Sequence, residues 1–371
     1  MIPRQFFFFW GQNTALPYTR YLTMATCRLQ HPDAPMYLYQ CRCADRDHWG
    51  CGIFVDFQFN GEELNKLYKE LEVEGVVVPD NLRDVAYDVL LHSKEPAPWD
   101  SIRYDQAAIK AALKTYGTAE TLTAELGRVV DKRMAREARR PQKHNYIQEA
   151  VERLGVELRE YEPGDKRVYT MPPPNVSDIF SVEILSREGG WYLDLDQVVM
   201  KPLDGIGRSY DFVCGGQTAF YIGIFGSKQG GWVVGDFYGK MLGSYDPKFY
   251  NSSGISAIVH SCLENNEWLN AFKDGKNGIN HILEQDHFYP LLAPDGANRF
   301  WGGNFDICGR DAAASECVHY YGGNPVSQRF FREMTPDNIL SFDGGNNCMS
   351  RYIKKVSNNG EGNKRIFCFE E

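Results

Sequence analysis

The chain has 371 residues and a formal net charge of -9. A chain of this length can bury a substantial core as one large domain or two modest ones. Its acidic balance argues against a globally basic nucleic-acid-binding protein. No apolar run approaches the roughly twenty residues that span a bilayer, and the N-terminus lacks the features of a signal peptide. We therefore expect no transmembrane segment, a cytoplasmic location and, for the ten cysteines, reduced thiols.

The N-terminal residues predict the start of a parallel sheet. Residues 4–11 read as a buried strand that ends in Gly11, residues 16–30 as a helix, and residues 36–39 as a second strand after a proline-rich break. Strand, helix and strand in this order are typical of a βαβ unit. Trp10 ends the first strand, where it either packs in the core or stacks on a nucleotide base.

Four potential zinc ligands follow the second strand: Cys41, Cys43, His48 and Cys51. Thiolates and an imidazole are suitable ligands, but the C-x-C spacing differs from the paired C-x-x-C spacing of structural zinc sites. Ordinary thiols near a strand end are the alternative interpretation.

Residues 61–143 predict a helical insertion, because four stretches with helical periodicity are separated by prolines and a glycine. Its last helix is basic and includes Arg136, Arg139 and Arg140. A charge run is usually a solvated face. The alternative is a surface that binds an anionic acceptor such as nucleic acid, lipid phosphate or acidic polysaccharide.

After the insertion, residues 145–154 predict a helix capped by Gly155, and residues 156–158 return the chain to the sheet. Three prolines at positions 172–174 predict a stiff, extended spacer. Ser177 is then expected to cap the next helix, which would place Asp178 in its first turn.

The stretch from residue 177 to residue 196 changes its hydrophobic period halfway. A helix over residues 178–188 is expected to end at two glycines, and residues 191–196 alternate as a strand. That alternation places Asp194 and Asp196 on the face of Tyr192, opposite the leucines between them. A hard divalent cation is the usual partner of neighbouring carboxylates. An exposed Asp-x-Asp turn is the alternative. Residues 197–203 are expected to leave the sheet at once.

The same stretch resembles the DxD glycosyltransferases of the sugar-binding-region type, which include fungal mannosyltransferases, capsule and lipopolysaccharide enzymes and, more distantly, the clostridial glucosylating toxins. The matching residues are Ser177-Asp178, Gly189-Gly190, Tyr192 and Asp194-Leu195-Asp196. One position departs, since Ser181 stands where the family usually carries an arginine that helps to hold the donor. The resemblance implies an α/β fold of the GT-A type, a Rossmann-like mixed sheet with helices on both faces.

The resemblance also implies a set of site residues. His319 follows a predicted strand and is expected to join Asp194 and Asp196 as a metal ligand. A neutral imidazole can complete a carboxylate site for Mn²⁺, although a lone strand-end histidine is more often structural. Donor contacts are expected from Trp10, Gly11, Asp178, Tyr192, Asp194, Gly322, Gly323 and Asn324.

Further positions are weaker expectations from the same resemblance. Gln217 and Gly223 would line a sugar pocket, and Asp286 would face the acceptor as a catalytic carboxylate. A loop aspartate without a catalytic role is the alternative for Asp286. For Asp178, the alternative to a donor contact is stabilisation of the helix dipole.

The predicted function is a glycosyltransferase that uses Mn²⁺ or Mg²⁺, with catalysis by Asp194 and Asp196. By resemblance, its donor is a UDP-hexose and it retains the anomeric configuration. The acceptor, a polysaccharide, a protein or a modified DNA base, stays open. The expected organisation is the first part of the nucleotide-binding domain (residues 1–60), the insertion (61–143), the remainder of the catalytic domain (144–336) and a C-terminal tail over the site (337–371). The sequence leaves open whether this tail forms a strand.

Two other functions remain compatible with the residues. A nucleotidyltransferase would share the carboxylates and the metal, but it should carry a Gly-rich N-terminal loop with Lys or Arg, and residues 11–14 are poor in both. A sugar- or nucleic-acid-binding protein without catalysis would keep the fold and lose metal dependence.

Overall fold

The computed structural model describes residues 1–11, 15–41, 67–79, 81–83, 86, 106–115, 118–124, 126, 144–171, 173–216, 221–245, 254, 280–283, 285–292, 295–322 and 325–369. The strands are β1 (Phe6–Phe9), β2 (Met36–Cys41), β3 (Glu157–Tyr161), β4 (Gly190–Leu193), β5 (Gln197–Val199), β6 (Phe212–Gly215), β7 (Tyr221–Ser227), β8 (Asn280–Leu283) and β9 (Cys317–His319). The main helices are α1 (Tyr18–Gln30), α4 (Gln106–Thr115), α6 (Ile147–Leu154), α7 (Pro173–Glu188), α8 (Asp204–Ser209), α9 (Trp232–Ser244), α12 (Gln285–Phe288), α13 (Gly296–Trp301), α14 (Pro325–Glu333), α15 (Cys348–Ser357) and α16 (Glu361–Phe367).

The central sheet has seven strands in the order β3-β2-β1-β4-β7-β6-β8. Strands β3, β2, β1 and β4 run parallel to one another, β7 is antiparallel to β4 and β6, and β6 is parallel to β8. The predicted mixed α/β architecture of the GT-A type is therefore confirmed. Because β1 lies between β2 and β4, the strand order reverses there, and ligands of such sheets bind outside the carboxyl ends of the strands at this switch point.

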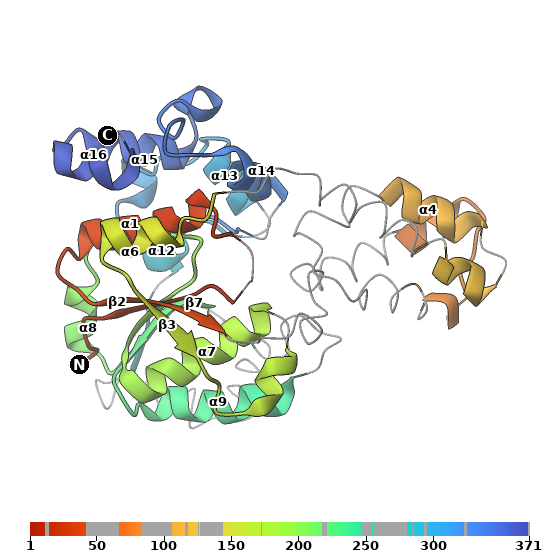
Figure 1. Ribbon diagram of the computed structural model, residues 1–371, viewed down its shortest axis with the longest axis horizontal. Coiled ribbons are helices and arrows are strands. Elements are labelled where there is room, and N and C mark those ends of the chain that lie inside the picture. The colour runs from red at the N-terminus through yellow and green to blue at the C-terminus, as the bar shows by residue number, and fades with distance from the viewer. Residues whose placement is uncertain are drawn as a thin grey trace.

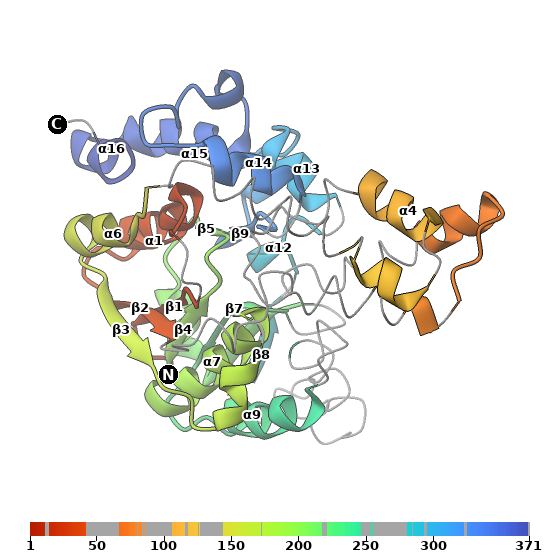
Figure 2. The ribbon, with the colours of Figure 1, turned by 45° about the vertical axis from the view of Figure 1, so that its right-hand side comes forward.

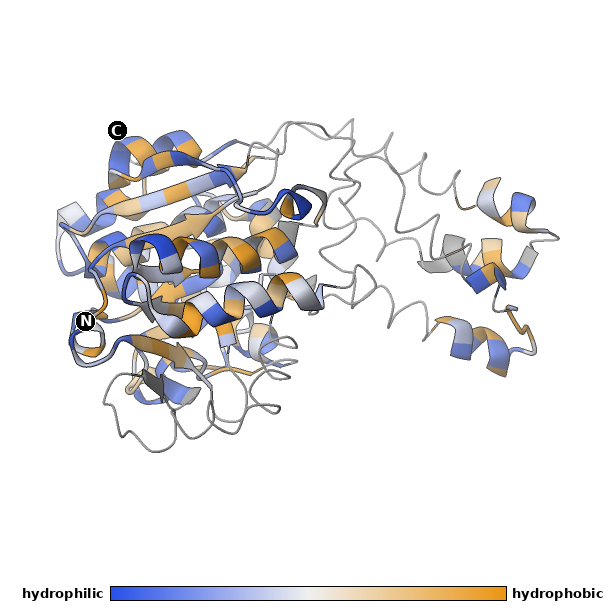
Figure 3. Cartoon of the chain, turned by 90° about the horizontal axis from the view of Figure 1, so that it is seen from below, coloured by the Kyte–Doolittle hydropathy of each residue, from blue (hydrophilic) through white to orange (hydrophobic). Residues whose placement is uncertain are grey.

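The four phenylalanines of β1 explain why helices cover both faces of the sheet. Phe6 and Phe8 join the core on the side of α1 and α6, whereas Phe7 and Phe9 join the core beside α7 and α9. A strand buried on both faces reads as a continuous apolar run. Figures 1 and 2 show these helix pairs on opposite sides of the sheet. In Figure 3 the helices carry apolar and polar stripes, as amphipathic helices on a sheet require.

Helix α7 begins earlier than the sequence predicted. It starts at Pro173, so the expected extended spacer is wrong at Pro173 and Pro174. Proline is tolerated in the first helical turn, where its missing N–H would have no intrahelical acceptor. The expected end is confirmed, because Gly189 adopts a φ of 67° and its N–H donates to the Leu185 carbonyl at 3.0 Å.

The C-terminal tail, for which the sequence left a strand open, contains helices instead, since residues 348–357 and 361–367 form α15 and α16. In Figures 1 and 2 these helices lie outside α1 and α6. Tyr18 and Tyr21 of α1 donate from their hydroxyls to the carbonyls of Phe367 and Ile366, and Tyr352 donates to the Val199 carbonyl at 3.1 Å. The first two bonds fix α16 to α1, and the third fixes α15 to β5.

Helix α4 lies away from the α/β body in Figures 1 and 2. It contributes to a separate hydrophobic cluster, with members Leu67, Tyr68, Leu71, Val78, Leu82, Ala86, Ala112, Leu113, Leu122 and Leu126. The assignment of residues 61–143 to an insertion stays a prediction. Among the described residues, no helix has the length and apolar character to cross a membrane.

Candidate metal centre

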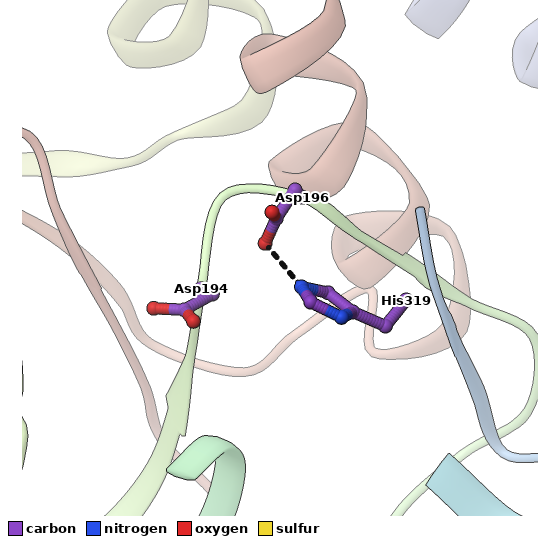
Figure 4. A group of neighbouring side chains, drawn as sticks. All are labelled: Asp194, Asp196 and His319. Atoms are coloured by element: carbon purple, nitrogen blue, oxygen red, sulfur yellow. Dashed lines mark ion pairs between the residues drawn. The ribbon is translucent and has the colours of Figure 1, made fainter. Parts of the chain in front are cut away.

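Asp194, Asp196 and His319 meet at the carboxyl edge of the sheet (Figure 4). Asp194 directly follows β4, and Asp196 lies in the turn that leads to β5. One ligand atom from each residue lies within 4.8 Å of those from the others, and His319 Nε2 is 3.0 Å from Asp196 Oδ1. The three side chains therefore have the spacing of a shared ion site.

A second, two-stranded sheet brings the histidine to the aspartates. Strand β5 pairs antiparallel with β9, and Gln197 lies opposite His319 in the register. Residues 197–203 do leave the central sheet, as expected. The pairing of residues 197–199 with a strand more than a hundred positions later was not predicted. This pairing places His319 beside Asp196, the residue that precedes Gln197.

Asp196 is held as a carboxylate by its neighbours. Its Oδ2 accepts a hydrogen bond from the Gly322 N–H at 2.7 Å, and Arg20 Nη1 lies 3.5 Å from the same oxygen. Burial by itself would raise the pKa of Asp196, but His319, Arg20 and the Gly322 N–H outweigh it and hold that pKa below its ordinary value. The Oδ1 atom is left facing His319.

Asp194 shows the opposite shift. Burial raises the pKa of Asp194 to about 7, and the Asp196 carboxylate adds to the rise. The Tyr192 hydroxyl opposes it by donating to Asp194 Oδ1 at 2.6 Å, and Ser177 Oγ lies 2.7 Å from that hydroxyl. Ser177 thus contacts Tyr192 instead of capping the helix as expected. A cation between the two aspartates would favour ionisation of both.

Asp178 belongs to the same electrostatic group. Burial raises its pKa, and the charge of Asp194 raises it further. Because α7 begins at Pro173, Asp178 lies beyond the first turn, so the helix-dipole interpretation loses its basis. A donor contact by Asp178 stays a prediction.

The residues present fit a divalent cation. Three buried polar atoms of the centre lack a hydrogen-bond partner among the described residues. They are Asp196 Oδ1, His319 Nδ1 and Oε1 of Gln197, which follows Asp196 in the sequence. Buried polar groups normally have partners. Two carboxylates with an imidazole form a donor set suited to Mn²⁺ or Mg²⁺.

Other predicted site residues lie in different settings. Trp10 is buried at the end of β1, its ring belongs to the core beside α1, and Gly11 follows it at the switch-point edge. Asp286 lies on α12 with an exposed side chain, and its carbonyl accepts from Ser315 Oγ at 2.6 Å. Its acceptor role stays a prediction. Cys41 ends β2. The remaining predicted positions lie outside the described residues: Cys43, His48, Cys51, Arg136, Arg139, Arg140, Gln217, Gly323 and Asn324.

Two residues of the centre were missed. Arg20 lies on α1 among apolar residues, so the sequence did not single it out. The one feature that could have indicated it is a charged residue within an otherwise buried helix segment. Tyr289 follows α12, and its hydroxyl accepts from the Ile224 N–H at 3.0 Å. Burial, followed by the charge of Asp194, raises the pKa of Tyr289. Neither residue is near the DxD motif in sequence.

Residues 102–213 match the family model described as glycosyltransferase sugar-binding region containing DXD motif. The match includes Asp194 and Asp196 and begins inside the predicted insertion. No curated protein matches the chain. Among solved structures, a chain titled PaToxG Glycosyltransferase has 11% sequence identity and a TM-score of 0.35, with 73% of each chain covered. At that TM-score the likeness carries no argument here.

The family match over residues 102–213 and the paired aspartates within it support a DxD-type glycosyltransferase. An enzyme of this kind takes a sugar donor and an acceptor.

Proposed function

We propose that this glycosyltransferase moves a hexose from a UDP-sugar to its acceptor with Mn²⁺ or Mg²⁺ and with retention of configuration. The observation that supports it is the meeting of Asp194, Asp196 and His319 beside the switch point of the sheet. The UDP donor and the retention are proposed from the sequence resemblance.

In this proposal the residues of the centre have distinct roles. Asp196 Oδ1 and His319 Nε2 would hold the ion, because Asp196 Oδ2 already accepts from Gly322. Asp194 is oriented by Tyr192 and would support the ion or the donor hydroxyls. When bound, a divalent cation stabilises the charge that develops on the leaving diphosphate. Asp178 would contact the sugar or the ribose.

The decisive experiment replaces the aspartates. Asp194→Asn and Asp196→Asn should each lower metal-dependent UDP-sugar hydrolysis by about a hundredfold or more, because charge stabilisation is the main contribution to such catalysis. Asp33→Asn, an exposed aspartate between α1 and β2, is the matched control and should leave the rate unchanged. The proposal would be falsified if the two site variants hydrolysed UDP-sugars at the wild-type rate.

The donor can be identified by protection against thermal unfolding. A ligand that binds only the native state raises the apparent stability by RT ln(1 + [L]/Kd). We expect UDP-hexoses with Mn²⁺ to raise the Tm more than GDP-sugars or CMP-sugars. A larger shift with another nucleotide would replace UDP in the proposal.

The acceptor is proposed to be a polysaccharide, a protein or a modified DNA base. Reversing the charges at Arg136, Arg139 and Arg140 separates these classes. A DNA acceptor predicts duplex binding that falls steeply with salt and is lost in the charge-reversed protein. Unchanged duplex binding, or none in the wild type, would leave the glycan and protein classes.

A further inference from the structure

Arg20 is a buried arginine at the candidate metal centre. It lies in the first turn of α1 with 8% of its surface exposed. Its Nη1 is 3.5 Å from Asp196 Oδ2, and its guanidinium lies 4.7 Å from the centre of the Phe331 ring. Its Nε has no hydrogen-bond partner among the described residues. A charge this deeply buried needs a compensating charge nearby.

The carboxylates supply that compensation. Asp194 and Asp196 lie together, and Asp178 interacts electrostatically with Asp194. Arg20 is effectively always protonated, whereas a histidine carries a charge only when it binds a proton. Arg20 is therefore the permanent positive charge among the described groups that contact Asp196. At 3.5 Å its contact acts more through charge than through a directional hydrogen bond.

Gly322 makes this approach possible. A Cβ on Gly322 would lie 2.5 Å from Arg20 Nη2 and 2.7 Å from its Cζ. The glycine N–H is meanwhile donated to Asp196 Oδ2. Because Gly322 has no side chain, it leaves room for the guanidinium of Arg20.

We propose that Arg20 is a positioning residue that acts as a built-in counter-ion, which keeps Asp196 in place when no metal is bound and competes with the metal for its charge. The carboxylate then has two states. Without a cation, Arg20 balances the charge of Asp196, and the acidic centre stays folded. With a cation on Oδ1, the positive charge of Arg20 opposes binding. The part of this inference that concerns competition with the metal rests on the proposed function.

The first test is a double-mutant cycle in EDTA. Arg20→Met keeps the length of the side chain and removes its charge, so Asp196 is left buried without its permanent counter-charge. We expect a loss of about 5 °C or more in Tm. In an Asp196→Asn background the same change should cost less than half as much, because no uncompensated carboxylate remains. An equal loss in both backgrounds would show that Arg20 acts only by packing, and would overturn the inference.

The second test measures Mn²⁺ affinity by calorimetry. Arg20→Met should bind Mn²⁺ about tenfold more tightly, because a repelling charge is gone, and its Tm should rise more with Mn²⁺ than that of the wild type. Weaker Mn²⁺ binding by Arg20→Met would contradict the inference. Failure of the wild type to bind Mn²⁺ or Mg²⁺ would instead refute the metal site itself, while the cycle in EDTA would still test the counter-ion.

Two further variants complete the design. Arg351→Met removes another partly buried arginine, which lies on α15 and donates to the Gly303 carbonyl at 2.9 Å. It should lower the Tm without changing the response to Mn²⁺. Arg20→Lys keeps the charge and should stay close to the wild type in EDTA and in Mn²⁺ affinity. If Arg20→Met does not fold, Arg20→Lys provides the test. A lower Tm together with tighter Mn²⁺ binding in Arg20→Lys, which keeps the charge, would show that the effect of Arg20 does not depend on its charge.

Discussion

Gly223 of β7 leaves space for three polar side chains of the centre. A Cβ there would lie 2.9 Å from Asp194 Oδ2, 3.0 Å from the Tyr289 hydroxyl and 3.2 Å from Gln197 Nε2. Gly223→Ala should displace Asp194 and weaken Mn²⁺ binding by about tenfold or more, in the range of other changes to residues that orient a metal ligand. Isothermal titration with Mn²⁺ measures the effect.

A glycine three positions along the same strand provides the control. A Cβ on Gly226 would be as close as 2.8 Å to the Trp191 ring. Gly226→Ala should cost about 1–3 kcal/mol of stability through overpacking, with Mn²⁺ affinity retained. Equal Mn²⁺ affinities for both variants would mean that Gly223 does not shape the centre.

His31 makes stability depend on pH. Burial lowers its pKa from 6.5 to about 4, and its Nε2 accepts from the Leu203 N–H at 3.2 Å, which requires that nitrogen to be unprotonated. Because the unfolded chain binds this proton more readily, the contribution is fully present above pH 6.5 and is lost as pH falls toward 4. The loss amounts to roughly 3 kcal/mol at most.

Urea unfolding at pH 7.5 and pH 5 measures this loss. In His31→Gln the difference in unfolding free energy between the two pH values should be smaller than in the wild type. If both proteins lost the same stability on acidification, another group would be responsible.

At the residue scale, the sequence predicted the aspartates but not their supporting residues. The strand predicted through Asp196 ends at Leu193 in the structure, yet Asp194 and Asp196 still come close together. Arg20 and Tyr289 reach the centre from α1 and from the segment after α12. Their contacts depend on tertiary packing, which no local spacing reports.

At the element scale, Arg28 joins three segments. From the last turn of α1 it donates through Nε to the Leu154 carbonyl at 2.7 Å and through Nη1 to the carbonyls of Pro32 and Ala34 at 2.7 and 2.9 Å. These acceptors end α6 and precede β2. Arg28→Met should lower the free energy of unfolding by about 3 kcal/mol, since bonds from a charged donor are individually strong and would be lost together.

Chemical denaturation measures the Arg28 effect, and Arg310→Met is the control. Arg310 has a side chain that is 95% exposed, so its replacement should stay within about 0.5 kcal/mol of the wild type. A small effect at Arg28 would mean that water replaces its bonds without cost.

The elements themselves were predicted unevenly. Periodicity and turn residues located β1, α1, β2, α6 and the end of α7, because each depends on local signals. The pairing of β5 with β9 was missed because three-residue strands carry almost no pattern, and the start of α7 was missed because prolines are compatible with both a spacer and a first turn.

At the scale of the whole molecule, the cluster around α4 is separate from the two cores of the sheet. Leu113 of α4 is fully buried in it. Leu113→Ala should cost about 2–5 kcal/mol locally and speed hydrogen exchange in residues 106–115, while residues 190–199 keep their protection. Loss of protection in both regions would show that the two parts unfold together.

The layered architecture was predictable because alternating strands and helices leave few topologies once connections are short and right-handed. The position of β4 on the far side of β1 was not, since the chain first adds β3 beside β2 and then returns through α7 to place β4 beside β1. That return creates the switch point at which the centre lies.

Asp196 contacts the segment that follows β9, where its carboxylate accepts from the N–H of Gly322, 126 positions later in the sequence. Closing so long a loop is entropically costly, and an ion that bridges Asp196 and His319 would act as a removable cross-link across it. At a hundred times its dissociation constant, such an ion adds about 2.7 kcal/mol. Chelation would then loosen the junction between Asp196 and the segment after β9, so that resistance to proteolysis would fall in EDTA.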